Sequence, residues 1–579
     1  MEITCSNFKE NLPEIQKAIE NSLFVSIDCE FSGLNIVRNI NAFDTPKEYY
    51  KKMRTNCKDF LVMQYGLSTF RYNQEENNFI QSSYNFYIFR RPINRNIPDN
   101  RFLCQSSSID FLISHSFDFN KLFKEGLPYL NQIETDKYKD NVDQAYQKAL
   151  EIIESNANEV EPDIIPIPEN AQQFMEDVKQ QIEVFLKTEE TEMQLPKCNA
   201  FFRRLVYQIK ESEYFGKISV ETRQIEKDRV LFVTKLKSPE EEKQLAKKKY
   251  EEQKQELDDF IGFTKVLKII IESGKLVIGH NLCLDFFHTV DKFLMPLPES
   301  YEEFKQMSHS LFSRVLDTKY MSSNEPFKEL ISSTVLGQLL EIVSKKPFGL
   351  PEIVIEEPSK GYTTDCSKEH EAGYDAFITG LCFLGMWKHL GLLDNRSDCK
   401  TFQNMDLLEP YMNRLFLMTL TDSQYIHLSG EDLQPSRDHV FHLTFPKEWK
   451  LSNVQQLFSP FGNIYVSWID ETSAYIALYK KDQAKMAYTT LRNGDGYSLK
   501  TFAARQVQLS VENGLRITSP TPSKKRKSSD SPAHVKSKRV DNSAINSALS
   551  KMTIQPETMV VEREDNAKSK VFQEDDNWT

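Results

Sequence analysis

The sequence predicts a multidomain α/β protein. We expect one α/β domain with a mixed sheet, an α+β unit inserted into it, a second α+β domain after it, and a disordered tail. The chain has 579 residues, too many for one hydrophobic core, and its 40% apolar content is enough to fill several. Strand-like and helix-like patterns alternate over most of the chain. From Thr518 onward the sequence turns to Ser, Pro and Lys with few apolar residues, which cannot form a packed core.

The first part of the α/β domain covers residues 1–165. A short helical pattern over Asn11–Ile19 leads into an apolar strand that starts at Phe24. Two more strand-like runs, Val62–Phe70 and Asn85–Phe89, precede the first long helical region. Three strands before a long helix indicate a mixed sheet that opens an α/β domain.

The inserted unit covers residues 170–237. A charged, exposed helix over Glu134–Glu161 and the proline-rich linker Pro162–Pro168 precede it. Its own patterns predict two helices and then two strands: Ala171–Lys187, Asn199–Lys210, Ile218–Arg223 and Arg229–Leu236. The Lys- and Glu-rich block Ser238–Leu257 then predicts an exposed helix that returns to the first domain.

The α/β domain resumes over residues 238–430. A helical stripe at Val266–Ile271 precedes a short buried strand, Lys275–Gly279, and Arg314–Tyr320 is predicted as a further strand. After a linker, residues 437–512 predict a β-α-β-β-α-β unit. Its clearest elements are a strand, a helix and a later strand: Val440–Phe445, Leu451–Phe458 and Ala474–Leu478. Residues 513–579 form the predicted disordered tail.

Composition excludes several classes of protein. A net charge of −12 argues against global coating of nucleic acid, so nucleic-acid binding would need local basic patches or stacking. The nine cysteines lie far apart without a Cys-x-x-Cys pair, which indicates neither a disulfide framework nor a structural zinc site and favours a reducing compartment. We find no signal-like segment and no uninterrupted apolar run near the roughly 20 residues that span a bilayer. A soluble intracellular protein with no membrane partner is expected.

Two acids stand at the end of the first predicted strand. Asp28 and Glu30 alternate with Cys29, so both carboxylates project from one face of the strand. Such a pair repels itself unless a cation lies between the groups, and hard oxygen ligands suit Mg²⁺ or Mn²⁺. An isolated Asp-x-Glu is more often an ordinary polar strand end, so acids elsewhere in the chain decide the interpretation.

Two further acids follow. Asp285 comes just after the strand that ends at Gly279, where ligand sites of α/β sheets usually lie, and Asp375 begins a helical core stripe. Four carboxylates are about the number that anchors two divalent ions, and two such ions can hydrolyse a phosphodiester. His370, with a near-neutral pKa, is a candidate for taking the proton of the attacking water, whereas His280 more simply braces its loop.

These motifs resemble a known superfamily. Asp28-x-Glu30, His280-Asn281-x-x-x-Asp285 and His370-x-x-x-x-Asp375 are similar to the three exonuclease motifs of the DEDD superfamily, in the DEDDh subclass with a His before the last Asp. The segments Cys104–Phe111 and Leu316–Lys319 resemble, within it, the family of poly(A)-specific ribonucleases.

The resemblance implies a fold and a function. The fold is a ribonuclease-H-like exonuclease domain, and the activity is 3′→5′ removal of mRNA poly(A) tails with release of 5′-AMP. Two Mg²⁺ ions per active site, replaceable by Mn²⁺, would be held by Asp28, Glu30, Asp285 and Asp375, with His370 as a further catalytic residue. A homodimer is also implied. Alternatives are a DNA exonuclease, a trimmer of small non-coding RNA 3′ ends, and a non-catalytic RNA-binding adaptor.

Residues that would bind RNA are less clear. Phe31 and Ile109 resemble positions that line the nucleotide pocket in the family, where apolar and aromatic surfaces stack on bases. Lys319 could meet a phosphate or a base, or be a plain surface lysine. Selectivity for adenine rests on the resemblance alone.

The inserted unit resembles the R-three-H domain, which binds single-stranded nucleic acid. Its signature is Arg-x-x-x-His, and here Tyr207 stands where the His is expected after Arg203. Basic and aromatic residues are interleaved in this helix, which suits RNA. RNA binding and a packing or dimer-supporting role both remain open.

Residues 437–512 resemble an RNA-recognition-motif domain. Its third strand lacks the usual basic residue and one stacking aromatic, which weakens ordinary binding of RNA on the sheet face. Trp468 resembles the tryptophan on which the family stacks the cationic 7-methylguanosine cap, and Lys447 is the nearby cation for the cap phosphates. The alternative is a half-buried core tryptophan.

The tail carries two basic clusters, Lys524–Lys527 and Lys536–Arg539. Their spacing predicts a bipartite nuclear-import signal, with RNA tethering as the alternative. We therefore expect the protein in both nucleus and cytoplasm.

Overall fold

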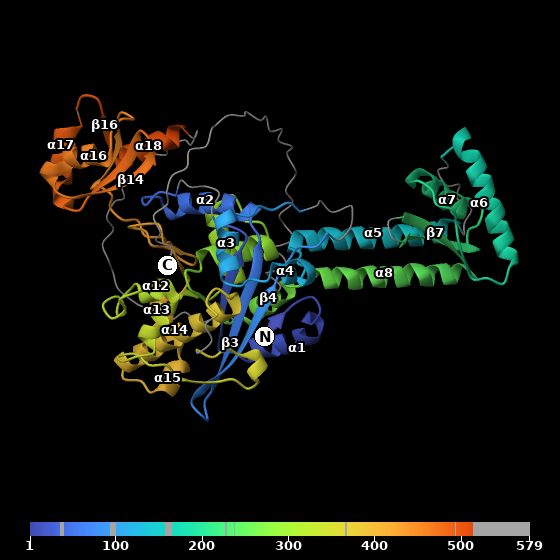
Figure 1. Ribbon diagram of the computed structural model, residues 1–579, viewed down its shortest axis with the longest axis horizontal. Helices are drawn as coiled ribbons and strands as arrows, with labels where there is room; N and C mark the ends of the chain where they lie inside the picture. The colour runs from blue at the N-terminus through green and yellow to red at the C-terminus, as the bar shows by residue number, and fades with distance from the viewer. Residues whose placement is uncertain are drawn as a thin grey trace, which may run out of the picture.

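A computed structural model describes residues 1–34, 40–92, 100–156, 165–225, 228–236, 238–364, 368–492 and 494–512 of the chain (Figure 1). The tail from residue 513, with both basic clusters and the predicted disorder, lies outside the described residues. Sequence analysis predicted an α/β domain with an inserted and an appended α+β unit, and this fold class is confirmed.

The central domain is built on a mixed sheet. Its strand order is β1-β4-β3-β2-β8-β9, and β10 pairs with β4. The first acid-bearing strand, β2, runs antiparallel to β3 and parallel to β8. The strands are β1 Glu2–Ile3, β2 Phe24–Phe31, β3 Val62–Asn73, β4 Asn78–Tyr87, β8 Leu276–Gly279, β9 Val315–Asp317 and β10 Glu352–Val354.

Two predicted strands have different bounds in the structure. The strand predicted at Asn85–Phe89 starts earlier, at Asn78, because it pairs with β3 as a long hairpin whose last pair is Asn73 and Asn78. The strand predicted at Arg314–Tyr320 ends at Asp317, and a short helix, α12 (Thr318–Ser322), follows it. The Asp317 side chain accepts the backbone N–H of Lys319 at 2.9 Å, which caps this helix and ends the strand.

Helices cover both faces of the sheet. On one face, Phe24 and Leu276 pack with α14 (Ala372–Leu393). On the other, Val25, Ile27, Cys29 and Phe31 pack with α1 (Phe8–Asn21), α9 (Thr264–Ser273) and α10 (Cys283–His288). Alternate residues of β2 thus face different cores, and Asp28 and Glu30 share the face that carries α14.

Helix α14 is the most apolar long helix of the described chain. By length and composition alone, Ala372–Leu393 is long and apolar enough to cross a bilayer, although Asp375 and Lys388 interrupt its apolar sequence. Yet 78% of its most apolar window is buried inside the protein. It is apolar on all sides because the sheet and α13 (Leu336–Val343), α15 (Asp398–Phe402) and neighbouring loops surround it.

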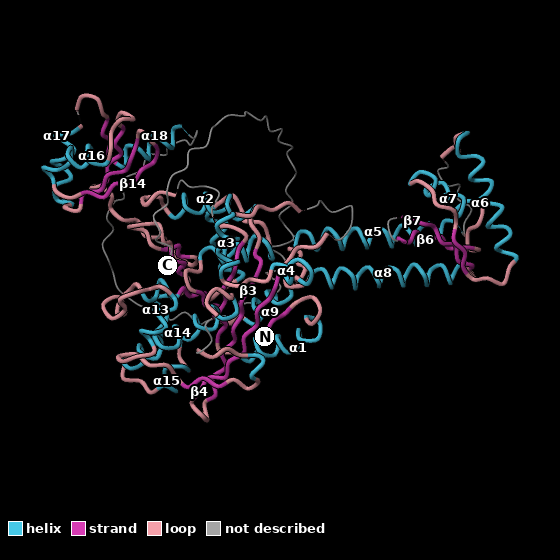
Figure 2. The backbone as a smooth tube through the Cα atoms, viewed as in Figure 1, coloured by secondary structure: helices cyan, strands magenta, loops and turns pink. Residues whose placement is uncertain are grey.

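The inserted unit stands at the end of two long helices, α5 (Gln132–Asn156) and α8 (Pro239–Ile261), which run side by side away from the central domain (Figure 1). Tyr146 and Tyr250 stack between them with ring centroids 4.4 Å apart, and the Tyr250 hydroxyl donates to Asp143 at 2.7 Å. The unit itself packs two helices on a three-stranded sheet (Figure 2): α6 Glu169–Lys187, α7 Ala200–Ser212, β5 Glu192–Gln194, β6 Ile218–Ile225 and β7 Asp228–Lys235.

The C-terminal unit has a four-stranded sheet in the order β14-β15-β13-β16. Its elements are β13 Val440–Thr444, α16 Leu451–Phe458, β14 Ile464–Asp470, β15 Ser473–Leu478, α17 Ala484–Leu491, β16 Ser498–Thr501 and α18 Phe502–Glu512. The β-α-β-β-α-β order matches the prediction, whereas the final helix α18 was not foreseen.

Smaller elements complete the described part of the chain. The remaining helices are α2 Pro46–Asp59, α3 Ser106–Ser114, α4 Phe119–Glu125 and α11 Tyr301–Leu311, and the last short strands are β11 Arg414–Phe416 and β12 Tyr425–His427. A short π-helix lies at Thr289–Leu294, and short 3₁₀-helices lie at Pro358–Lys360, Met405–Tyr411, Ser459–Phe461 and Lys481–Gln483.

The loop that follows the acid-bearing strand β2 docks the C-terminal unit onto the central domain. The Phe43 ring contacts Tyr465 and Tyr475 edge to face, at centroid distances of 5.9 and 6.1 Å. The Arg437 guanidinium pairs with Asp422 and donates to the Phe43 carbonyl at 2.6 Å. The two units therefore share a packed, hydrogen-bonded interface.

Candidate active site

The catalytic candidates begin on β2. Asp28 and Glu30 are half-buried near its end, on the sheet face covered by α14. Cys29 points to the opposite core and is 6% exposed. The alternation that the sequence predicted is therefore present, and both carboxylates face the start of α14.

Asp285 reaches the same region from α10, directly after β8. It is 8% exposed, and the thiol of Cys29 hydrogen-bonds to its carboxylate. Burial is the main cause that raises the pKa of Asp285, to about 7. A carboxyl with this pKa is protonated in about half of the molecules at pH 7, and a cation that stabilises the charge would ionise the rest.

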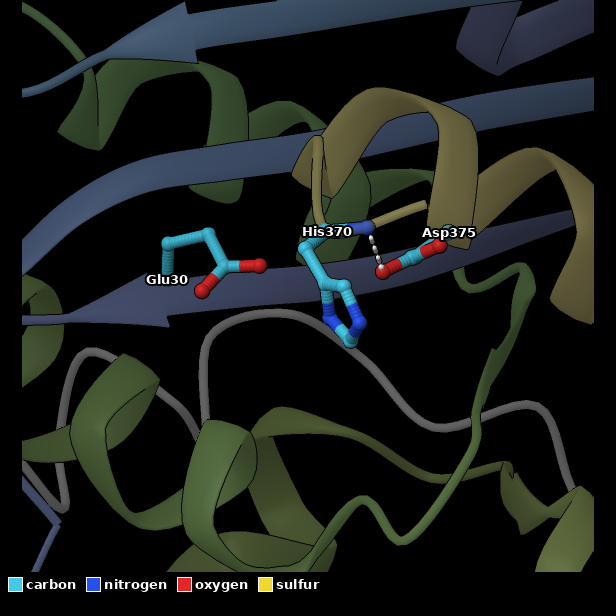
Figure 3. Close-up of side chains that lie close together, drawn as sticks. All are labelled: Glu30, His370 and Asp375. Atoms are coloured by element: carbon cyan, nitrogen blue, oxygen red, sulfur yellow. Dashed lines mark hydrogen bonds between the residues drawn. The ribbon is translucent and has the colours of Figure 1, made fainter. Parts of the chain in front are cut away.

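Asp375 and His370 come from the start of α14 (Figure 3). The His370 backbone, with φ of 68°, turns so that its N–H donates to Asp375 Oδ2 at 3.0 Å. Burial raises the pKa of Asp375 to about 7 despite this hydrogen bond. The left-handed conformation at His370 thus brings its N–H to the Asp375 carboxylate.

The four acids form one electrostatic cluster. Burial first, and then the charges of Asp285 and Asp375, raise the pKa values of Asp28 and Glu30 well above the usual range. Within the described ranges, no lysine or arginine forms an ion pair with any of the four. Buried carboxylates without a cationic partner are costly, so a divalent cation fits this donor set.

Three ligand atoms lie closest together. One atom from each of Glu30, His370 and Asp375 lies within 4.8 Å of the other two, close enough to share one ion. Asp28 and Asp285 are outside this group, although their charges act on it. The structure thus brings all five predicted catalytic residues into one region.

His370 has aromatic neighbours that sequence analysis did not identify. Its ring centroid lies 4.3 Å from that of His115 and 4.6 Å from that of Phe111, both on or next to α3. Burial, and then the charge of His115, lower the pKa of His370. The ring is therefore neutral near pH 7 and able to accept a proton.

His280 and Asp317 brace the loop that carries Asp285. His280 Nε2 donates to the Thr334 carbonyl at 2.9 Å and its Nδ1 bonds to Thr318 Oγ1 at 2.9 Å. The fully buried Asp317 accepts four backbone N–H groups: Asn281 at 3.0 Å, Leu282 at 2.9 Å, Lys319 at 2.9 Å and Phe416 at 3.0 Å. Sequence analysis included Asp317 in the segment Leu316–Lys319 but gave it no role. The available signal was an acid at the end of a short apolar strand, β9.

Comparison with known proteins identifies the family. A family model described as CAF1 family ribonuclease matches residues 3–383, more than half of the chain and all four acids, and a model described as RNA binding domain matches residues 430–508. The chain belongs to the CAF1 family of ribonucleases. RNA is therefore the substrate class of this site.

Individual relatives are similar to this chain over most of its length. The poly(A)-specific ribonuclease PARN of Xenopus laevis is 43% identical over 513 residues, which cover 87% of this chain and 81% of that protein. The Homo sapiens protein of the same name is 43% identical over 514 residues, covering 87% and 80%. Among solved structures, S. pombe Pop2p in its Mg²⁺- and Mn²⁺-bound form is 15% identical with a TM-score of 0.32, covering 66% of this chain and 90% of that one.

The predicted RNA-binding residues of this CAF1-family ribonuclease are placed less favourably than its acids. Phe31 is 7% exposed and its ring packs on His288 at 4.6 Å, so the structure does not present it for stacking on a base. Lys319 is on helix α12, not on a strand, and is half-buried. Ile109 is half-buried on α3 against the cluster around Leu112. Their contacts with RNA stay predictions.

The predicted cap residues lie on the C-terminal unit. Trp468 is 44% exposed on β14, its ring edge contacts Phe445 at 5.5 Å, and its carbonyl accepts from Asn41 Nδ2 at 3.4 Å. Lys447 is exposed and forms an ion pair with Glu471. A partly exposed indole with a cation in the same unit is compatible with a cap site, which stays a prediction.

The R-three-H-like helix uses its signature residues internally. Arg203 donates to the Cys198 carbonyl at 2.6 Å, and the Tyr207 hydroxyl bonds to Thr222 at 3.1 Å across to β6. Both contacts stabilise the inserted unit. RNA binding by this unit stays a prediction.

Proposed function

We propose that this ribonuclease is a 3′→5′ exonuclease that shortens poly(A) tails and releases 5′-AMP, with a role in mRNA decay. The observation that supports it most is the convergence of four carboxylates and His370 without a cationic partner among the described residues. Membership of the CAF1 family and 43% identity to proteins named poly(A)-specific ribonuclease support the choice of RNA and of adenine.

The residues of the site would have three roles: metal binding, proton transfer and positioning of a loop. Asp28, Glu30, Asp285 and Asp375 would hold two Mg²⁺ ions, with Mn²⁺ able to replace them. When bound, such ions activate a water and stabilise the leaving oxygen of a phosphodiester. His370 takes the proton of the attacking water at a ring nitrogen, for which its lowered pKa leaves it unprotonated. Asp317 and His280 hold the loop that fixes Asp285.

Degradation of labelled oligonucleotides tests this function. Oligo(A), oligo(U), a structured small RNA and single-stranded DNA, each with a 5′ label, are incubated with the protein in Mg²⁺ or EDTA. We expect stepwise shortening of oligo(A) from its 3′ end, with 5′-AMP as product and no reaction in EDTA. Faster trimming of the structured RNA or of DNA would favour those substrates, and no hydrolysis of any would favour the adaptor.

Cap binding is proposed for the edge of the C-terminal sheet. The aromatic at the centre of the usual RNA-binding face, Tyr475, is 7% exposed because Phe43 and Phe502 pack against it. The exposed Trp468 is outside this covered area. A 7-methylguanosine cap is cationic and would stack on its indole, and Lys447 would meet the cap phosphates once released from Glu471.

Two further proposals concern the whole protein. It forms a homodimer, which light scattering coupled to size-exclusion chromatography tests through the molar mass in solution. It resides in both nucleus and cytoplasm, with import through Lys524–Lys527 and Lys536–Arg539. Replacing the lysines of both clusters with alanine is expected to remove the nuclear fraction, and unchanged nuclear signal would contradict this.

A further inference from the structure

The start of α14 rests directly on the central sheet. A Cβ atom at Gly66, on β3, would lie 1.8 Å from the carbonyl oxygen of Ala372, so any other residue there would push the helix away. Gly66 pairs with Asp28 of β2 and with Asn85 of β4. Helix α14, which carries Asp375, therefore packs on the sheet at Gly66, the residue directly opposite Asp28.

Two side chains of the sheet cap this helix. The Ala372 N–H donates to Gln64 Oε1 at 2.9 Å, and the Gly373 N–H donates to Asn85 Oδ1 at 3.0 Å. The first N–H groups of a helix lack partners inside it, and the residue just before the helix usually supplies one. Here that residue, Glu371, makes no such bond. The caps come instead from β3 and β4, about 290 to 310 residues away in sequence.

Both capping residues are in register with the catalytic strand. Gln64 is directly opposite Glu30, and Asn85 lies one strand beyond Gly66, which is opposite Asp28. Directly opposed residues of antiparallel strands project from the same face. Gln64 and Asn85 thus connect the strand that carries two of the acids to the helix that carries Asp375.

We propose that Gln64 and Asn85 are positioning residues of the nuclease site. They fix the height and rotation of the first turn of α14, and so hold Asp375 and His370 in register with Asp28 and Glu30. Their exposed fractions are 2% and 0%, so they act through the helix and do not touch RNA. The roles of the acids in this inference rest on the proposed function, whereas the capping contacts do not.

Three variants on one strand test the role of Asn85. Asn85→Leu removes the acceptor and keeps the number and branching of the side-chain heavy atoms. Asn85→Asp keeps an acceptor oxygen for the Gly373 N–H and replaces the amide nitrogen, which has no partner among the described residues, with a second carboxyl oxygen. The matched control is Asn78→Leu, since Asn78 is also on β4, is 4% exposed and donates to Glu76, away from α14.

Two readouts are compared in the full-length protein. For Asn85→Leu we expect kcat on oligo(A) at saturating Mg²⁺ to fall about 100-fold with KM within about twofold, because misplacement of catalytic groups by about 1 Å costs this much. Its Mn²⁺ dissociation constant, measured by electron paramagnetic resonance without RNA, should rise about tenfold. Asn85→Asp should restore both quantities, and Asn78→Leu should leave both unchanged at a comparable loss of thermal stability.

Equal kcat and Mn²⁺ affinity in Asn85→Leu and Asn78→Leu would overturn the proposal and leave Asn85 as an ordinary buried amide. If Asn85→Leu does not fold, Gln64→Met tests the proposal independently, because it removes the other cap of α14, which comes from β3. If the unsubstituted protein hydrolyses no oligo(A), the proposed function fails. The Mn²⁺ titration then still decides whether these residues position the acids.

Discussion

At the scale of single residues, burial is the main cause of the raised pKa values of the acids. Asp285 and Asp375 are each 8% exposed, and burial raises both pKa values to about 7. In the unfolded chain the same groups ionise near pH 4. Between about pH 4 and pH 7 the metal-free folded protein therefore binds more protons than the unfolded chain, and its stability falls as pH rises through this window.

This charge balance predicts a metal-dependent pH effect. In EDTA, the melting temperature should be lower at pH 8 than at pH 5, and Mg²⁺ should recover most of the difference because ions bind the ionised carboxylates of the folded state. Differential scanning fluorimetry at both pH values measures it. Asp285→Asn, which cannot ionise, should shrink the metal-free difference. A melting temperature in EDTA that is independent of pH would refute the raised pKa values.

His370 gives a second prediction at this scale. His370→Ala should slow the chemical step by about 10²- to 10⁴-fold, the range for loss of a general base. Mn²⁺ affinity should stay within a few-fold if the imidazole moves a proton, and should fall sharply if it is a ligand together with Glu30 and Asp375. Single-turnover rates across pH measure the first effect. A rate and a pH profile equal to those of the unsubstituted protein would remove His370 from the reaction.

At the scale of elements, local patterns predicted the acid-bearing strand well and its supports poorly. The alternation of Asp28 and Glu30 on β2 follows from the two-residue repeat of any strand, so the sequence alone was sufficient. Gln64, Asn85 and Asp317 act on segments far away in the chain, through strand register and backbone hydrogen bonds that no local pattern encodes. Lys319 is a different case, because its helix starts at a local cap from Asp317, two residues earlier, which the strand prediction did not take into account.

At the scale of the whole molecule, the loop that contains Asn41 and Phe43 connects the strand of Asp28 and Glu30 with the C-terminal unit. It follows β2 in the chain, and Asn41 in this loop donates to the Trp468 carbonyl. Helix α18 was not predicted, and its Phe502 covers the sheet face together with Phe43. Packing between the two units thus decides which face of the RNA-recognition-motif-like unit is exposed to solvent. Composition and periodicity do not reveal this packing.

Trp468 supplies the prediction at this scale. Trp468→Ala should abolish the preference for methylated over unmethylated cap analogues, because cation–π attraction to the indole contributes about 1–2 kcal/mol. Hydrolysis of uncapped oligo(A) should stay within about twofold. Fluorescence quenching and decay of capped and uncapped RNA measure these effects. Tyr479→Ala removes an aromatic that is 69% exposed on the same unit and serves as control. A cap preference that survives Trp468→Ala would assign cap binding elsewhere.

The most direct test of the account is the rate of one turnover on labelled oligo(A) as Mg²⁺ is raised, for the unsubstituted protein and for Asp28→Ala, Glu30→Ala, Asp285→Ala and Asp375→Ala. Loss of one ligand from a two-metal centre removes several kcal/mol of transition-state stabilisation, so each variant should be slower by about three decades or more while remaining folded. Asp110→Ala, at an exposed acid on α3, should match the unsubstituted protein. Normal turnover by any of the four variants at saturating Mg²⁺ would contradict the assignment of that carboxylate to the metal site.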